Sequence, residues 1–525
     1  IFFQQQKLRA YYNFLGIDSV RYTIDGEKKM FTSAVREVPL VEPQPWLAWW
    51  GQQYMLYTHG YGLVMAEAAQ VTPEGEPVYV ASGIPMQTSY DTLQVEQPRI
   101  YYGEGAGTMA YTNVRGMKEL DYPTEQGRAE LWLPEDFGTG VHVDSLVKRL
   151  AFGWRSGQFF DVLFSGIITD DTRVHYYRTP LERLERVAPF LYYDGGSMYA
   201  SVIDGEVVWL ANALTTSQDY PYSMIGDLGD KSDERTRYPR PHRIVNYVED
   251  SVKATVDAAS GKLTFYRMSD DPLISTWAGI YPDLFVDGRS EMPAEVRDQL
   301  TYPLQFFHLQ FDDLFIYYHM QDPMYYFNME DMFDDADEVL GPIMAGGDAI
   351  RFSTEPQSFL LETGGPIPAA RDPLQYALAM PFTSEKAWGL RAMPIAYQDG
   401  DDYGRLVVLM VPKGHFTPSP EQADAAIDQN PNISRDFSWW SRMGSDVIRG
   451  HTSTLVIGNE VIYVEPIFIR SAQNRVTQLK RVAVVFRGVA RMGDSLEAAL
   501  RRAMSDYQAG ARGEMPTAED LEGAM

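Results

Sequence analysis

The sequence predicts an α+β fold with mainly antiparallel sheets, because hairpin signals and helix-capping signals are interleaved along the chain without a regular βαβ rhythm. Each hairpin signal joins two alternating, β-branched arms through a tight turn of Asp, Gly or Asn. These turn residues tolerate the positive φ that two-residue hairpin loops require. Hairpins of this kind are predicted at 22–32, 201–210, 255–266 and 455–464.

Further strands are predicted where β-branched and aromatic residues gather in short runs, since such side chains fit a pleated, half-buried surface. These runs lie at 97–102, 109–114, 172–177, 405–411 and 481–487.

Helices are predicted where a capping residue precedes an apolar-periodic run. The segments TPLE (179–182) and SPEQ (419–422) both place Ser or Thr at the N-cap, Pro at the first helical position and Glu or Gln three residues after the cap. Other helices are expected from Asp144, over 292–320 with an interruption at its proline, and from Asp494.

The domain organisation follows from length and from two loop-like segments. A chain of 525 residues is too long for one compact core. Residues 226–243 are dense in charge and proline, and residues 341–373 are rich in glycine and proline. We therefore predict three domains: an N-terminal α+β domain, a middle hairpin plus helical segment, and a C-terminal α+β domain. Their bounds are 1–235, 236–355 and 356–525.

Composition excludes several classes of function. The formal net charge is −27, so the chain repels phosphate backbones, and we expect no nucleic-acid partner. An anionic lipid surface would also repel it unless something else tethers it, whereas cations and cationic partners suit it. The absence of cysteine excludes disulfides, thiolate metal sites and a cysteine nucleophile.

The stretch YTHGYG (57–62) is the first candidate functional loop, formed by His59, Gly60, Tyr61 and Gly62. In the interpretation we favour, His59 bonds its own loop backbone, Gly60 and Gly62 permit left-handed backbone on either side of Tyr61, and the tyrosine rings are buried nearby. The alternative is a general base, which would need a Ser or Asp partner in a known arrangement, and none is visible in the sequence. We therefore assign no catalytic residue.

Carboxylate clusters are the second candidate. The segment YQDGDDYG carries Asp399, Asp401 and Asp402, which could supply oxygen ligands for calcium, although the calcium-loop spacing is missing. The run at 330–338 could do the same, or could be an acidic helix end. No other cofactor is expected. The eight histidines are scattered and match no metal-binding or nucleophile motif.

The stretch YTHGYGLVMAEAAQVTPEGEPVYVASGIP resembles the signature of uncharacterised protein family 0182, a family of large bacterial multi-pass membrane proteins of unknown function. Colinear segments that continue the resemblance include RIYYGE, ELDYP, RVHYYRTPLERLERVAPFLYYD and IDQNPNISRDFSWWSRMGSDVIRG. The resemblance implies several N-terminal transmembrane helices and a large soluble region outside the cytoplasm, and it carries no activity or catalytic residues.

These observations predict a location and leave the reaction open. The chain begins IFFQQQ without methionine, so we expect it to be the soluble region of a longer protein. That protein would be attached to the cell membrane by a preceding segment, with this region facing the periplasm or the cell exterior. The predicted function is to bind a ligand or an envelope protein partner in maintenance, assembly or transport. The alternative is an envelope hydrolase that uses carboxylates or a bound divalent cation.

Overall fold

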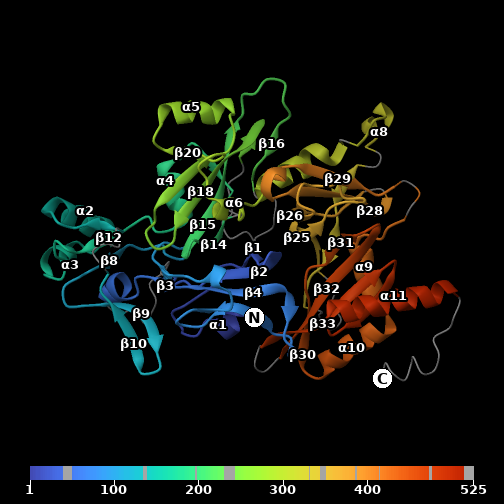
Figure 1. Cartoon of the computed structure of the whole chain (residues 1–525), viewed down its shortest axis with the longest axis horizontal. Helices are drawn as coiled ribbons and strands as arrows, with labels where there is room; N and C mark the ends of the chain where they lie inside the picture. Colours follow the sequence, from blue (N-terminus) through green and yellow to red (C-terminus); the bar gives the residue numbers. More distant parts are fainter. Residues whose placement is uncertain are drawn as a thin grey trace. The chain divides into compact units, whose positions relative to one another are not determined.

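The structure is a computed structural model and confirms the predicted class, a mixed α+β fold with mostly antiparallel sheets (Figure 1). Contacts divide the chain into two compact units. Unit 1 comprises Ile1, Gln70–Pro77 and Phe307–Met525, and unit 2 comprises Phe2–Ala69 and Val78–Phe306. The three-domain division stays a prediction. The residues that the structure describes are 1–39, 50–133, 139–194, 198–229, 243–317, 319–329, 332–342, 350–384, 387–412, 414, 416–471 and 476–512.

The first sheet of unit 2 has the strand order β1–β2–β4–β5–β6. Its first hairpin closes with Ile24 opposite Glu27, and the two turn residues, Asp25 and Gly26, have φ of 54° and 81°. This is the two-residue turn that the sequence predicts. The strands are β1 (Asp18–Ile24), β2 (Glu27–Val35), β4 (Leu63–Val71), β5 (Pro77–Ser82) and β6 (Gln87–Thr88).

The second sheet of unit 2 has the order β13–β15–β18–β19–β20, and β14 also pairs with β15. The predicted hairpin at 201–210 is confirmed, since Ile203 lies opposite Glu206 across a turn with positive φ at Asp204 and Gly205. The hairpin at 255–266 is confirmed as β18–β19 with a longer loop. The strands are β13 (Tyr192–Tyr193), β14 (Tyr199–Ile203), β15 (Glu206–Ser217), β18 (Tyr247–Asp257), β19 (Leu263–Arg267) and β20 (Phe285–Asp287).

Short strands complete unit 2 and carry the candidate site. They pair in the orders β3–β7, β10–β9, β16–β17 and β11–β12–β8. Their bounds are β3 (Gly60–Tyr61), β7 (Arg99–Ile100), β8 (Ala110–Thr112), β9 (Glu119–Thr124), β10 (Gly127–Leu131), β11 (Val141–His142), β12 (Arg173–His175), β16 (Gly226–Asp227) and β17 (Ile244–Val245). The helices are α1 (Phe2–Gln6), α2 (Leu146–Ser156), α3 (Phe159–Phe164), α4 (Pro180–Val187), α5 (Pro272–Ile280) and α6 (Ala294–Arg297), with α7 (Leu304–His308) spanning the end of the unit.

Unit 1 contains a sheet ordered β21–β27–β28–β26–β25, in which β29 pairs with β28, and a sheet ordered β23–β30–β32–β33–β34, in which β31 pairs with β32. The predicted hairpin at 455–464 is confirmed as β31–β32. The strands are β21 (Phe333–Asp335), β22 (Asp337–Val339), β23 (Gly341–Pro342), β24 (Arg351–Ser353), β25 (Gln357–Glu362), β26 (Leu374–Ala379), β27 (Phe382–Ser384), β28 (Ala387–Tyr397), β29 (Leu406–Met410), β30 (Ser445–Arg449), β31 (Ser453–Ile457), β32 (Glu460–Ser471), β33 (Thr477–Phe486) and β34 (Val489–Gly493). The helices are α8 (Pro323–Phe327), α9 (Pro420–Gln429), α10 (Pro431–Arg442) and α11 (Leu496–Arg512).

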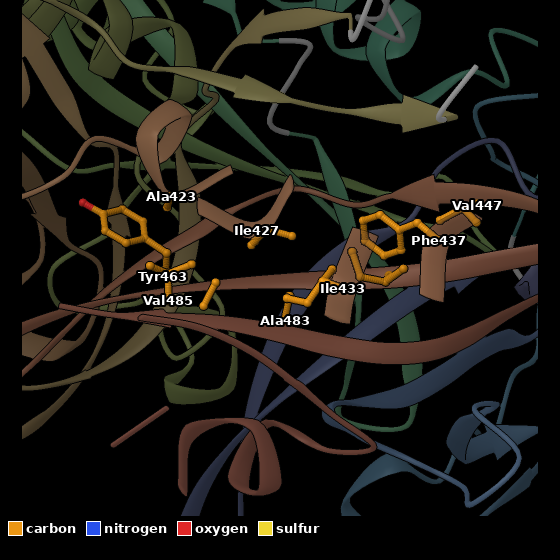
Figure 2. Close-up of a cluster of buried hydrophobic side chains, with 10 residues drawn as sticks. Ala423, Ile427, Ile433, Phe437, Val447, Tyr463, Ala483 and Val485 are labelled. Carbon is orange, nitrogen blue, oxygen red and sulfur yellow. The ribbon is translucent and has the colours of Figure 1, made fainter. Parts of the chain in front are cut away.

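Helices cover both faces of the second sheet of unit 1. Successive side chains along β33 point to opposite faces, so each face contributes apolar side chains to a different helix contact. Ala483 and Val485 pack with α9 and α10 in the buried cluster of Figure 2, where Ile427 and Phe437 point toward the strands. The intervening residues, represented by Val484, pack with α11. A near-continuous apolar run therefore marks a strand buried on both sides.

The helix caps correct two details of the sequence prediction. The capping box of α9 is confirmed, since the Ser419 side chain accepts from the Gln422 amide and the Gln422 side chain accepts from the Ser419 amide. Within the described residues, however, the Thr179 side chain makes no capping hydrogen bond at the start of α4. Helix α2 is capped by Ser145 and not by Asp144, because the Asp144 carboxylate pairs with Lys148 instead.

Candidate functional site

The YTHGYG stretch leads into the first sheet of unit 2 through a short strand. Gly60 and Tyr61 form β3 and lie opposite Ile100 and Arg99 of β7. Arg99 in turn makes a bidentate ion pair with Asp121 of β9, with N–O distances of 2.8 and 2.9 Å. The stretch is therefore held by backbone pairing on one side and joined to β9 through a charged pair.

The chain needs glycine at positions 60 and 62 for different reasons, and only Gly62 uses the left-handed backbone that both permit. Gly62 has a φ of 64°, a backbone conformation that residues other than glycine rarely adopt. Gly60 lies outside that region, but a Cβ there would stand 2.3 Å from the Arg36 carbonyl oxygen and 2.8 Å from Glu37 Cα. Gly60 thus permits a close backbone approach, and Gly62 permits a turn.

His59 bonds its own loop backbone, as the structural interpretation expects. Its Nδ1 lies 2.8 Å from the Gly60 carbonyl oxygen, which can only accept, so Nδ1 carries the proton and Nε2 is an acceptor in the neutral ring. The ring is buried against Tyr101, and among the described residues Nε2 has no hydrogen-bond partner. Burial lowers the pKa of His59 to about 4, so the ring is neutral near pH 7.

Glu119 is the carboxyl group of the site. Thr58 Oγ1 and the Tyr101 hydroxyl donate to its Oε2 at 2.5 and 2.9 Å, whereas its Oε1 is buried without a hydrogen-bond partner among the described residues. Burial raises the pKa of Glu119 to about 7, against the opposing effect of those two hydrogen bonds and of Arg99 and Arg178. This carboxyl group therefore exchanges its proton near neutral pH.

Arg178 joins the surrounding loops. Its buried guanidinium donates to the backbone carbonyls of Thr58 (2.5 Å), Tyr101 (2.7 Å) and Thr108 (3.2 Å). Burial lowers the pKa of Arg178 to about 10, which leaves it charged near pH 7. A single side chain thus fixes the loop that contains the YTHGYG stretch to segments far from it in sequence.

A second histidine completes what we call the signature cluster, which consists of Thr58, His59, Tyr101, Glu119, His175 and Arg178. His175 of β12 stacks on Tyr101 with ring centroids 5.0 Å apart, and its nitrogens lie 3.2 Å from Thr112 Oγ1 and 3.3 Å from the Tyr102 hydroxyl. Burial lowers the pKa of His175 well below its usual range. The cluster combines neutral imidazoles with one carboxyl group that titrates, so it can hold or release a proton.

Sequence reasoning missed Tyr101, Glu119, His175 and Arg178 as members of a site. A signal for them was nevertheless present, because each residue lies in a segment that resembles the family: RIYYGE, ELDYP or RVHYYRTPLERLERVAPFLYYD. Segments that resemble the same family can be expected to lie close together in the fold, and these three segments meet at the YTHGYG stretch.

The three aspartates predicted to bind calcium lie together on a turn of unit 1. Asp399 accepts from the Tyr376 amide at 2.6 Å, Asp401 pairs with Arg371, and Asp402 accepts from the Arg371 amide at 2.8 Å. Within the described residues, no group of three or more histidine or acidic side chains could hold a metal ion. The calcium role of Asp399, Asp401 and Asp402 stays a prediction, as does the hydrolase alternative.

The acidic run at 330–338 and the histidines discussed next lie outside the signature cluster. The acidic helix end suggested for 330–338 is wrong, because β21 and β22 occupy this region, where backbone pairing with other strands overrides the local signal. His308 ends α7, and His319 stacks on Phe333 with centroids 3.8 Å apart. His242, His415, Glu330 and Asp331 lie outside the described residues.

A second buried charged cluster, which we call the ion network, lies in unit 1. Arg449 of β30 donates to both oxygens of Glu465 at 2.5 and 2.6 Å and also pairs with Asp424 and Asp428 of α9. Glu338 accepts from His451 at 2.7 Å and from the Thr452 amide at 2.6 Å. Burial acts to lower the pKa of Arg449, but the hydrogen bonds and charge of Glu465 outweigh it and raise that pKa.

Fold and site together describe an α+β chain whose family-like segments gather in a buried polar cluster. Residues 1–440 match the model of a family described as "Uncharacterised protein family (UPF0182)". The chain belongs to this family, which confirms the resemblance found in the sequence.

Similar proteins extend the match to nearly the whole chain. A UPF0182 protein of Trichodesmium erythraeum is 35% identical over 92% of this chain and 51% of its own length. UPF0182 proteins of Methanospirillum hungatei and Desulforamulus reducens are 34% and 33% identical over 96% and 95% of this chain, and over 53% and 50% of their own lengths. The chain thus spans about half the length of these relatives. No solved structure was found to match it.

Across the described ranges, no helix is both long enough and apolar enough to cross a membrane.

Proposed function

We propose that this chain is the extracytoplasmic region of a membrane protein and binds a ligand or a protein partner in the cell envelope, in maintenance, assembly or transport. The observation that carries this proposal is the signature cluster. Family-like segments as far apart as Thr58 and Arg178 meet there, and Arg178 donates to three carbonyl groups in two loops. Buried hydrogen bonds that hold surface loops in fixed positions suit a protein that binds a ligand or partner through those loops.

Burial of the reactive groups supports binding over chemistry. His59 and Glu119 are 3% and 2% exposed, and a general acid or base must come within hydrogen-bond reach of a substrate. The net charge of −27 favours cationic ligands or partners, and the lack of cysteine leaves the fold independent of the redox state of its compartment.

The location is tested by protease accessibility in native cells. Spheroplasts are treated with protease before and after lysis, and an antibody against this chain follows its digestion. We expect digestion before lysis, while a cytoplasmic marker protein in the same spheroplasts stays intact. Digestion only after lysis would show that the proposed location is wrong.

The binding role is tested with the purified 525-residue chain as bait in detergent extracts of the envelope. An unrelated protein of equally negative charge serves as the matched bait, because it captures whatever binds acidic surfaces without specificity. We expect a defined partner that the control bait does not recover and that also binds the chain when purified. Identical recoveries from both baits across mild detergents would overturn this role.

A further inference from the structure

Helices α2 and α3 of unit 2 expose large apolar side chains that a folded surface normally buries. Trp154, Phe160 and Phe164 are 81%, 74% and 76% exposed, and Leu146, Val147 and Leu150 are also exposed. Residues 146, 150 and 154 recur every four positions, so they lie along one face of α2. The helices are neighbours at one edge of unit 2 (Figure 1).

These side chains are separate from those that hold the two helices in place. Phe152 and Val162 pack into the cluster of buried residues around Tyr111 and Val174. Gly153 permits close contact between the helices, since a Cβ there would lie 3.3 Å from both Phe159 Cα and Val162 Cβ. The inward faces therefore account for the folding of the pair, and the outward faces are left for another contact.

Basic side chains border this face. Lys148 pairs with Asp144 at 2.8 Å and Arg149 with Asp170 at 2.7 Å, and Arg155 is the third basic side chain of the two helices. Arg155 is exposed, with its guanidinium 4.3 Å from the centre of the Tyr177 ring. Apolar and aromatic side chains bordered by basic ones match a bilayer interface, where the former enter the acyl boundary and the latter reach headgroup phosphates.

We infer that the exposed faces of α2 and α3 rest on a lipid bilayer, with Trp154, Phe160 and Phe164 inserted among the acyl chains and the nearby basic side chains at the phosphates. This inference rests on the proposed function, because a bilayer must lie beside the region. The exposed Arg155 lies next to Trp154 in sequence and can reach a headgroup phosphate, whereas the acidic chain as a whole repels anionic lipid.

A second exposed apolar group lies on α8 of unit 1, where Met324, Tyr325 and Phe327 face solvent. No lysine or arginine occurs between residues 315 and 350, so this group lacks charges that could meet phosphates. It therefore provides a matched control, with apolar exposure but without the basic border.

The test is flotation of the purified 525-residue chain with phosphatidylcholine vesicles, whose neutral surface avoids long-range repulsion of the chain. The variant W154S/F160S/F164S should bind the vesicles at least about tenfold more weakly than the unchanged chain, since burying one large apolar side chain corresponds to about a factor of ten or more. The control variant M324S/Y325S/F327S should bind like the unchanged chain. Thermal unfolding verifies that both variants are folded.

Three outcomes would overturn the inference: no flotation of the unchanged chain, equal binding by the α2–α3 variant, or equal losses in both variants. Sedimentation adds a fourth. A dimer that only the α2–α3 variant dissociates, without vesicle binding, would show that a second copy covers this face. If flotation fails while the protease assay still finds the chain outside the cytoplasm, the bilayer contact is wrong and the proposed location stands.

Discussion

The signature cluster of unit 2 and the ion network of unit 1 are both buried and ionisable, but they satisfy their charges differently. In the ion network, Arg449 meets Glu465, Asp424 and Asp428 directly. In the signature cluster, His59 Nε2 and Glu119 Oε1 are buried without hydrogen-bond partners among the described residues.

This difference predicts different costs when one side chain of either cluster is removed. A buried charge with full compensation stabilises its surroundings as long as every partner is present. A buried group with an unmet hydrogen bond instead changes its protonation to reduce the cost of burial. Burial also raises the pKa of Glu465 to about 8 and that of Asp424 to about 6, so we expect both clusters to respond to pH and the ion network to be, in addition, the more sensitive to removal of one partner.

The largest effect is expected for Arg449→Met. Removing the guanidinium leaves Glu465 and Asp424 buried without their cation, which costs about 3–5 kcal/mol of unfolding free energy. Urea unfolding measures the loss. Arg470→Ala, which breaks an exposed pair with Asp446, is the control and should cost no more than about 1 kcal/mol. Equal losses in both variants would remove the distinction between buried and exposed pairs.

The next effect concerns Glu119→Gln and depends on pH. The pKa of Glu119 is raised to about 7 in the folded chain, so its contribution to stability is complete below pH 4.5 and is lost as pH rises through 7. Relative to the unchanged chain, the glutamine variant should gain about 2–4 kcal/mol between pH 4.5 and pH 8, because one pKa unit corresponds to about 1.4 kcal/mol. Urea unfolding at several pH values measures this gain, and exposed Glu130→Gln is the control. A difference that is constant with pH would contradict the prediction.

His59→Asn should show the opposite slope at a similar size. The pKa of His59 is lowered to about 4, so its contribution is present above pH 6.5 and is lost as pH falls through 4. The asparagine variant, which can still donate to the Gly60 carbonyl, should gain about 2–4 kcal/mol relative to the unchanged chain as pH falls from 6.5 to 4. The same unfolding series tests this, and a gain on the alkaline side would show that His59 is charged in the fold.

A smaller effect is expected for Gly60→Ala, which tests whether the loop of the signature cluster depends on close backbone approach. The added Cβ meets backbone atoms of Arg36 and Glu37, which cannot rotate away, so the variant should lose about 1–3 kcal/mol. Gly279→Ala is the control, because its Cβ meets open space among the described residues and alanine favours the α5 helix. Thermal unfolding of both variants measures the contrast, and an unaffected Gly60→Ala would refute it.

The smallest effect concerns the helices that carry the two clusters. Asp424 and Asp428 lie on α9, whose N-cap Ser419 makes a complete capping box, so Ser419→Ala should cost about 1 kcal/mol. Arg178 precedes α4, whose Thr179 makes no capping hydrogen bond within the described part of the chain. Thr179→Ala should therefore cost less than about 0.5 kcal/mol. Urea unfolding compares the losses of unfolding free energy in the two variants. A larger loss for Thr179→Ala than for Ser419→Ala would show that the Thr179 hydroxyl caps α4 in solution.

Local signals in the sequence were sufficient for the hairpins and for the best-formed cap. Asp25 and Gly26 tolerate the positive φ that a two-residue turn requires, and Ser419 with Gln422 bonds within one helical turn. Thr179 is the N-cap residue of α4 as predicted, but its predicted capping hydrogen bond is missing among the described residues. The acidic helix end suggested for 330–338 is wrong, because strand pairing outweighs the local preference there.

The sequence by itself determined the α+β class, the four hairpins, the acidic charge and the family of this chain. Only the tertiary structure decided that His59 lies beside Tyr101, that Glu119 accepts from Thr58, and that Arg178 reaches across 120 residues to the Thr58 carbonyl. The physical reason is range. Turn and cap preferences act between residues a few positions apart, whereas burial, pKa shifts and exposed faces depend on which distant segments meet.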